Sequence, residues 1–140
     1  PLKGWRHLPT DALQAEAHRH NLMALMLKHE RNLDDLAMAV HAANVKRDRM
    51  PRRRLSSTPI VADALPQIQC PLHVIFGEGD ALYKGRWPEV EALFKAEAPH
   101  LASWHLVPDS GHWVQYERTD AFQLALLACT AETAALSPNK

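Results

Sequence analysis

Two short apolar runs limit what this chain can fold into, because each is followed by a turn of Gly and polar residues. Residues 72–76 (Leu-His-Val-Ile-Phe) lie between Pro71 and Gly77 and are rich in β-branched and aromatic side chains. Such a run is typical of a strand buried on both faces of a parallel sheet. Residues 104–107 (Trp-His-Leu-Val) predict a second strand.

A helix is predicted after each strand. The first spans residues 88–98 and begins with Pro-Glu, which suits the first helical position and the helix dipole. Thr119 or Asp120 caps the second, which extends to about Leu127. The order strand, helix, strand, helix predicts a right-handed parallel crossover. Because two strands alone make a poor sheet, we expect further strands to come from elsewhere.

The chain divides into three parts by composition. Residues 1–50 predict a helical segment, residues 51–71 form a connector punctuated by prolines, and residues 72–140 form the α/β part. The run 46–54 is dense in Lys and Arg. Because it lacks interleaved aromatic residues, we interpret it as a solvated link rather than a site for an anion or nucleic acid.

The helical segment predicts two helices, because residues 10–48 contain neither Gly nor Pro. Thr10 or Asp11 can cap the first helix, and a break is expected at residues 29–32. The second helix must end by Pro51, which cannot donate a backbone bond. Apolar spacing predicts that its inward stripe holds Leu33, Leu36, Ala37, Val40 and Asn44.

Composition argues against several classes of protein. The 16 Lys and Arg balance the 16 Asp and Glu, so no global field favours nucleic acid or a membrane surface. No stretch approaches the roughly 20 apolar residues that span a bilayer. Cys70 and Cys129 cannot build a disulfide framework, so we expect a reducing, cytoplasmic compartment. The start at Pro1 lacks a signal peptide and an initiator Met, so we expect a processed or excised piece.

The turns after the two strands carry the reactive side chains. We call residues 77–80 (Gly-Glu-Gly-Asp) the acid turn and residues 109–112 (Asp-Ser-Gly-His) the histidine turn. The carboxyl ends of parallel strands share one edge of the sheet, where ligands and catalytic groups gather. A carboxylate that binds one ring nitrogen fixes the tautomer and leaves the other nitrogen free to accept a proton. Asp80 and His112 are therefore the candidate catalytic pair.

Simpler interpretations of these residues stay open. Asp80 could serve only as a turn residue that tolerates unusual backbone geometry, and His112 could be a core histidine with satisfied hydrogen bonds. Asp109 is a rival acid because it lies near His112 in the sequence, although we expect it to cap its own turn. Glu117 is interpreted as structural, tying its helix to the histidine turn.

Together the two turns resemble those of the α/β-hydrolase family. The acid turn, preceded by Phe76, resembles the turn after the family's penultimate strand. The histidine turn, followed by Glu117, resembles the family's G-H-x-x-x-x-E pattern. The candidate acid and histidine are 32 positions apart, which leaves room for one helix and one strand. The resemblance covers about residues 68–129, and residues 10–50 resemble the late helices of the family's lid.

The resemblance implies the C-terminal portion of an α/β-hydrolase fold: a helical lid segment plus the last two parallel strands and their helices. It implies a hydrolase that acts by acyl transfer on a small ester, amide or carbon–carbon (ketone) substrate, in which Asp80 orients His112. The family's nucleophile sits in a G-x-S-x-G turn before the lid, and no pair of this chain's five glycines brackets a serine in that way.

We therefore expect the nucleophile and the oxyanion-hole amides to lie upstream of residue 1, in an N-terminal part of the same enzyme that acts as this chain's partner. This chain alone is expected to be inactive. An upstream Asp nucleophile would shift the chemistry to epoxides or haloalkanes. No cofactor and no metal are implied.

Two residues are candidates for substrate contact. Trp113 is expected to line the acyl or leaving-group pocket, with packing of the last helix as the alternative. Residues 111–117 (Gly-His-Trp-Val-Gln-Tyr-Glu) resemble hydrolases that cleave carbon–carbon bonds of aromatic ring-fission (meta-cleavage) products. His41, Asn44 and Arg47 share one face of the second helix, and Arg47 could pair with a substrate carboxylate. A solvated helix face is the alternative for Arg47.

Another class of function also fits the sequence. In it the chain is a non-catalytic interaction module, whose open strand edges pair with another chain as a swapped homo-oligomer or a complement to an N-terminal fragment. An anion or nucleic-acid binder built on the basic run would show steeply salt-dependent binding. The hydrolase interpretation predicts a small-molecule substrate and no nucleic-acid or membrane partner.

Overall fold

The computed structural model describes residues 1–48 and 58–136 of the chain. The basic run therefore falls outside the described residues from position 49 onward, and so does the first part of the connector, residues 51–57. Among the described residues, no helix has the length and apolar character needed to cross a membrane.

The helical segment forms two helices joined by residues 26–34, which include a short 3₁₀ helix. Thr10 caps the first helix, because its hydroxyl accepts a hydrogen bond from the Leu13 amide, and Asp34 caps the second through Ala37. The expected break lies between them as a 3₁₀ turn. The elements are α1 (Asp11–Leu25), η1 (Glu30–Asn32) and α2 (Asp35–Arg47).

The α/β part follows the expected order of strand, helix, strand and helix, with a short additional helix before the last one. The last helix is longer than predicted, because the residues beyond Leu127 continue without Gly or Pro. The elements of the α/β part are β1 (Leu72–Gly77), α4 (Trp87–Glu97), β2 (Leu101–Val107), α5 (Val114–Glu117) and α6 (Thr119–Leu136). The described part of the connector forms α3 (Ile60–Ala64) and η3 (Leu65–Gln67).

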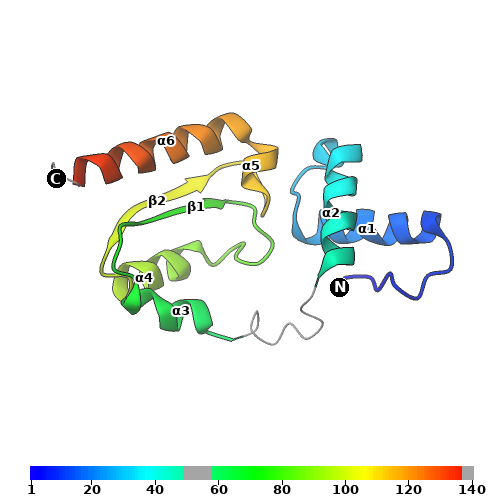
Figure 1. The fold of residues 1–140 in the computed structure, drawn as a ribbon, viewed down its shortest axis with the longest axis horizontal. Helices are drawn as coiled ribbons and strands as arrows, with labels where there is room; N and C mark the ends of the chain where they lie inside the picture. Colours follow the sequence, from blue (N-terminus) through cyan, green and yellow to red (C-terminus); the bar gives the residue numbers. More distant parts are fainter. Residues whose placement is uncertain (49–57, 137–140) are drawn as a thin grey trace.

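The two strands pair in parallel, as the crossover predicts. Their register aligns Leu72 with Leu101 at one end and Gly77 with Val107 at the other. Helix α6 lies on one face of this pair and α4 on the other (Figure 1). The turns that follow β1 and β2 therefore emerge at the same edge, where Figure 1 also places α5 and the helical segment.

An aromatic cluster fills the space between the sheet and α4. The ring of Phe76 lies 5.3 Å from that of Trp87 and 5.6 Å from that of Trp104. Trp87 also donates from its indole nitrogen to the Glu78 carbonyl, at 2.6 Å. Buried aromatic surface of this size dominates packing energy, and the indole bond fixes the start of the acid turn against it.

The helices of the helical segment pack through part of the predicted stripe, with Ala37 in the core and Leu33 against it. Leu36 and Val40 are 61% and 39% exposed, whereas Ala37 is fully buried and His41 nearly so. Ala37 lies against Leu22, since a small residue lets the two helices approach closely. The helices therefore meet along Ala37 and His41 of α2, and the predicted stripe is only partly buried.

Two histidines are buried between α1 and α2, and within the described part of the chain both ring nitrogens of His18 and Nε2 of His41 have no hydrogen-bond partner. His18 and His41 are 3% and 7% exposed, and their rings meet edge to face at 5.4 Å. Trp5 packs on the other side of His18 at 4.8 Å. Burial lowers the pKa of both imidazoles, and Lys46 lowers that of His18 further, so both rings are neutral at pH 7.

We expect the protein to lose stability as the pH falls below about 6.5, the ordinary histidine pKa. His18 and His41 titrate near that value when unfolded but lower when folded, so acid favours the unfolded chain. Urea midpoints at pH 7.5 and pH 5.5 measure the loss. The His18→Phe variant should show a weaker pH dependence, whereas His20→Gln, at an exposed position, should match the parent. Equal dependence in all three proteins would contradict this account.

Candidate active site

The acid turn and the histidine turn place Asp80 and His112 in direct contact. The Asp80 carboxylate lies 2.8 Å from Nδ1 of His112, and its other oxygen accepts from the Leu82 amide at 2.9 Å. The Asp80 side chain is 1% exposed, whereas that of His112 is 37% exposed. A buried acceptor thus holds one ring nitrogen, while the imidazole remains open to a reaction partner.

The contact changes the electrostatics of the imidazole. The hydrogen bond to Asp80 raises the pKa of His112, burial lowers it in part, and the charge of Asp80 adds to the increase. Since the carboxylate accepts only, Nδ1 carries the hydrogen and Nε2 is the acceptor in the neutral ring. This tautomer is the one a general base needs.

Backbone hydrogen bonds hold the two turns side by side. The amide of Glu78 donates to the Val107 carbonyl at 2.9 Å, and the amide of Gly79 donates to the Ser110 carbonyl at 2.7 Å. The Ser110 hydroxyl, fully buried, donates back to Val107 at 3.0 Å. The Asp80–His112 pair therefore rests on main-chain bonds that continue the strand pairing.

Asp109 does not compete for His112. Its carboxylate lies 2.7 Å from Nε2 of His29 and 3.2 Å from Nζ of Lys28. These contacts lower the pKa of Asp109 to about 2, those to Lys28 first and those to His29 next. The side chain thus pairs with the turn between α1 and α2, rather than only capping its own turn as the sequence suggested.

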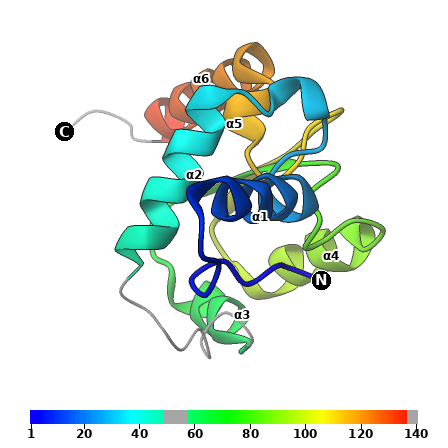
Figure 2. The ribbon, with the colours of Figure 1, turned by 90° about the vertical axis from the view of Figure 1, so that its right-hand side faces the viewer.

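Trp113 and Arg47 occupy different surroundings. Trp113 lines a cleft of about 1000 Å³, together with His41 and Asn44 of α2 and Trp5 of the N-terminal stretch. Arg47 is exposed and lies outside the residues that line the cleft. The structure therefore brings Trp113, but not Arg47, into the wall of the cleft beside the histidine turn. Figure 2 shows the N-terminal stretch running beside α1.

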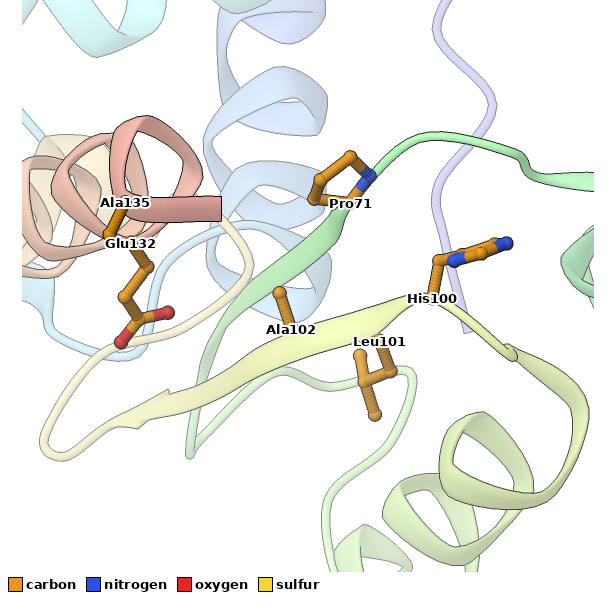
Figure 3. A pocket seen from close by; sticks show the side chains of 6 residues that line it. All are labelled: Pro71, His100, Leu101, Ala102, Glu132 and Ala135. Atoms are coloured by element: carbon orange, nitrogen blue, oxygen red, sulfur yellow. The ribbon is translucent and has the colours of Figure 1, made fainter. Parts of the chain in front are cut away.

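A second hollow, of about 520 Å³, lies at the opposite end of the strands from the Asp80–His112 pair. It is bordered by Pro71, Leu101 and Ala102, with Glu132 and His100 on opposite sides of it (Figure 3). This hollow is therefore not part of the candidate site. Within residues 1–48 and 58–136, no three His, Cys, Asp or Glu side chains are grouped to hold a metal ion.

The sequence did not indicate that residues 26–32 contact the histidine turn. We call this stretch the docking loop. Lys28 and His29 reach Asp109 although about 80 positions separate them in the chain. Their residue types, one lysine and one histidine at the end of a helix, are common on solvated surfaces. Only the three-dimensional path of the chain reveals the contact.

We expect Asp80→Asn to lower the pKa of His112 below the usual value of about 6.5, because burial remains while the carboxylate is lost. The raised pKa also means that the pair stabilises the fold fully below pH 6.5, and that this contribution declines as pH rises through the folded pKa. NMR titration of the His112 ring measures the shift. An unchanged His112 pKa in the variant would show that the contact does not form.

Gly77→Ala tests the fit between the turns. A Cβ at this position would overlap the Gly111 carbonyl oxygen and lie 2.8 Å from the Ser110 hydroxyl. Since both neighbours are held, the substitution should cost about 1–3 kcal/mol or more and separate Asp80 from His112. Gly85→Ala is the control, because no atom lies within 4 Å and only its φ of +82° opposes a side chain. Equal unfolding midpoints for the two variants would refute the prediction.

Comparison with known proteins identifies the fold. No family model matches the chain, and no curated protein is significantly similar in sequence. The crystal structure of proline iminopeptidase from Mycobacterium smegmatis matches with a TM-score of 0.59 at 16% identity, over 91% of this chain. The match spans 44% of that structure. The chain therefore has the architecture of part of an α/β-hydrolase fold, with two parallel strands and their helices, as the sequence predicted.

Proposed function

We propose that this chain supplies the acid and the histidine of a serine-type α/β hydrolase that acts by acyl transfer. One observation carries the proposal: the buried carboxylate of Asp80 binds Nδ1 of the more exposed His112 at 2.8 Å, at the carboxyl edge of two parallel strands. The likeness to a solved hydrolase structure supports the fold on which that pair is placed. A nucleophile-bearing N-terminal part completes the site in this proposal.

In the proposed mechanism each residue has one role. Asp80 accepts from Nδ1 of His112 and stabilises the imidazolium that forms. Nε2 of His112 removes the proton from the attacking serine hydroxyl and later returns it to the leaving group. The serine forms a covalent acyl intermediate, which water then hydrolyses with His112 as base. Backbone amides of the N-terminal part stabilise the developing oxyanion.

The helical segment acts as the lid in this proposal. The cleft that Trp113 lines is bounded by α1, α2 and the N-terminal stretch. Trp113 directly follows His112 in the chain, so we propose that part of a substrate bound at His112 extends toward this cleft. Trp113 offers an apolar wall next to the reacting centre. Arg47 keeps its proposed role as a partner for a substrate carboxylate only if that group extends beyond the cleft wall.

Esters, amides and carbon–carbon bonds beside a ketone are the proposed substrate classes. All three pass through attack on a carbonyl carbon, so the same pair serves each of them. The neighbouring structure is named as a peptidase, which favours an amide. The carbon–carbon class rests on the run of residues 111–117.

An interaction module is the second candidate, and the open sheet favours it. The described residues form a sheet of two strands, so one edge of β1 and one of β2 lack a strand neighbour there. Unpaired edges recruit strands from other chains. This candidate predicts that the molar mass of the protein in solution increases with protein concentration. It also predicts that adding the N-terminal part produces no hydrolytic activity, which would favour it over the hydrolase.

The proposal predicts that His112→Ala abolishes hydrolysis of p-nitrophenyl acetate by the protein assembled with its nucleophile-bearing part. The loss should reach at least about a thousandfold in kcat, because no other group takes the proton. His105→Ala is the control, since His105 lies in β2 away from the turns. Activity retained by the His112 variant, with an intact fold, would overturn the proposal.

A further inference from the structure

The carboxylate of Glu117 collects hydrogen bonds from two separate parts of the chain. One oxygen accepts from the Gly111 amide at 2.5 Å, next to His112. The docking loop supplies the others, from the amides of Lys28 and His29 at 3.0 Å and from the Asn32 side chain at 2.8 Å. A single side chain thus joins the histidine turn to a loop more than 80 positions away.

The carboxylate is ionised where it sits. Burial alone would raise the pKa of Glu117, but the hydrogen bonds from Asn32 and from the amides of Lys28, Gly111 and His29 lower it overall. Hydrogen bonds to a charged acceptor are roughly twice as strong as those between neutral groups. The junction is therefore held by charge-assisted bonds that are partly shielded from water.

The docking loop also contacts the backbone on the other side of His112. The Trp113 amide donates to the Met26 carbonyl at 2.9 Å. A Cβ on Gly111 would lie 2.8 Å from the Lys28 amide and 2.9 Å from the Met26 carbonyl, so only glycine fits there without displacement. The amides of Gly111 and Trp113, the residues on either side of His112, are thus held by Glu117 and the docking loop together.

We propose that Glu117 is a positioning residue for His112, which couples the seating of the docking loop to the orientation of the imidazole against Asp80. The inference rests on the proposed function of His112. It assigns the loop between α1 and α2 a role in that site: when the loop shifts, bonds on both sides of His112 break.

Asp109 holds the docking loop without contacting the backbone beside His112, unlike Glu117. Its contacts to Lys28, His29 and Arg31 also join the docking loop to the histidine turn, but they involve side chains only, and its own side chain is 44% exposed. Exposed ion pairs contribute little and are screened by salt. Removing Asp109 therefore loosens the attachment without releasing the amide of Gly111.

The experiment compares Glu117→Gln with Asp109→Asn, which remove one negative charge each from the same junction. Asn tolerates the left-handed backbone of position 109, where φ is 58°. NMR titration of the His112 ring in this chain is the first readout. The pH profile of p-nitrophenyl acetate hydrolysis, with the nucleophile-bearing part supplied, is the second.

We expect the glutamine variant to lower the pKa of His112 and to reduce kcat roughly tenfold or more, with KM changed less, because the base is misplaced. The Asp109→Asn variant should leave the pKa of His112 and kcat close to those of the parent. Equal shifts in both variants, or a lower melting temperature with an unchanged His112 pKa in Glu117→Gln, would overturn the proposal.

Asn32→Ala is a second variant for the same test, and it can be used if Glu117→Gln fails to fold. It removes one loop donor and leaves the bond between Glu117 and Gly111 in place. A smaller shift of the His112 pKa in the same direction supports the coupling, and an unchanged pKa refutes it. NMR titration measures the pKa of His112 without enzyme turnover, so it tests this inference independently of the proposed function. The proposed function fails on a different result, namely an active His112→Ala variant.

Discussion

The rest of the candidate site depends on the parallel pairing of β1 with β2. The register sets Gly77 opposite Val107, so the two strands end at the same level of the sheet. The amides of Glu78 and Gly79 then continue the pairing into the turns by donating to Val107 and Ser110. Without that continuation, Asp80 and His112 would be side chains on two independent loops, and no single bond of 2.8 Å would hold them together.

Three carboxylates surround the histidine turn, and their burial separates their roles. Asp80 is almost fully buried and binds the imidazole, so its charge acts on His112 through little water. Glu117 is partly buried and binds backbone amides, so it acts on the imidazole only through the backbone beside it. Asp109 is exposed among cations and holds side chains of the docking loop. Distance along the sequence would favour Asp109 as the acid that binds His112, because it lies only three positions away.

The elements near the turns could be predicted because their signals are local. A short apolar run between Pro71 and Gly77 indicates a buried strand, and a proline at the first position indicates where α4 begins. The pair of Asp80 and His112 followed from the order of those elements. Burial in the helical segment was harder, since Leu36 faces solvent while His41 faces inward. There the two helices bury the rings of His18 and His41 against each other, and apolar spacing alone does not predict that choice.

The docking loop was beyond sequence analysis for a different reason. Besides the side chains that contact Asp109 and Glu117, it contributes backbone groups: the amides of Lys28 and His29 and the carbonyl of Met26. Every residue except proline offers such groups, so no residue type signals the contact. The specific demands fall instead on its partners, a glycine at 111 and a carboxylate at 117. The backbone part of the contact therefore constrains the histidine turn, which must keep the space at Gly111 and the charge at Glu117, more than it constrains residue types in the loop.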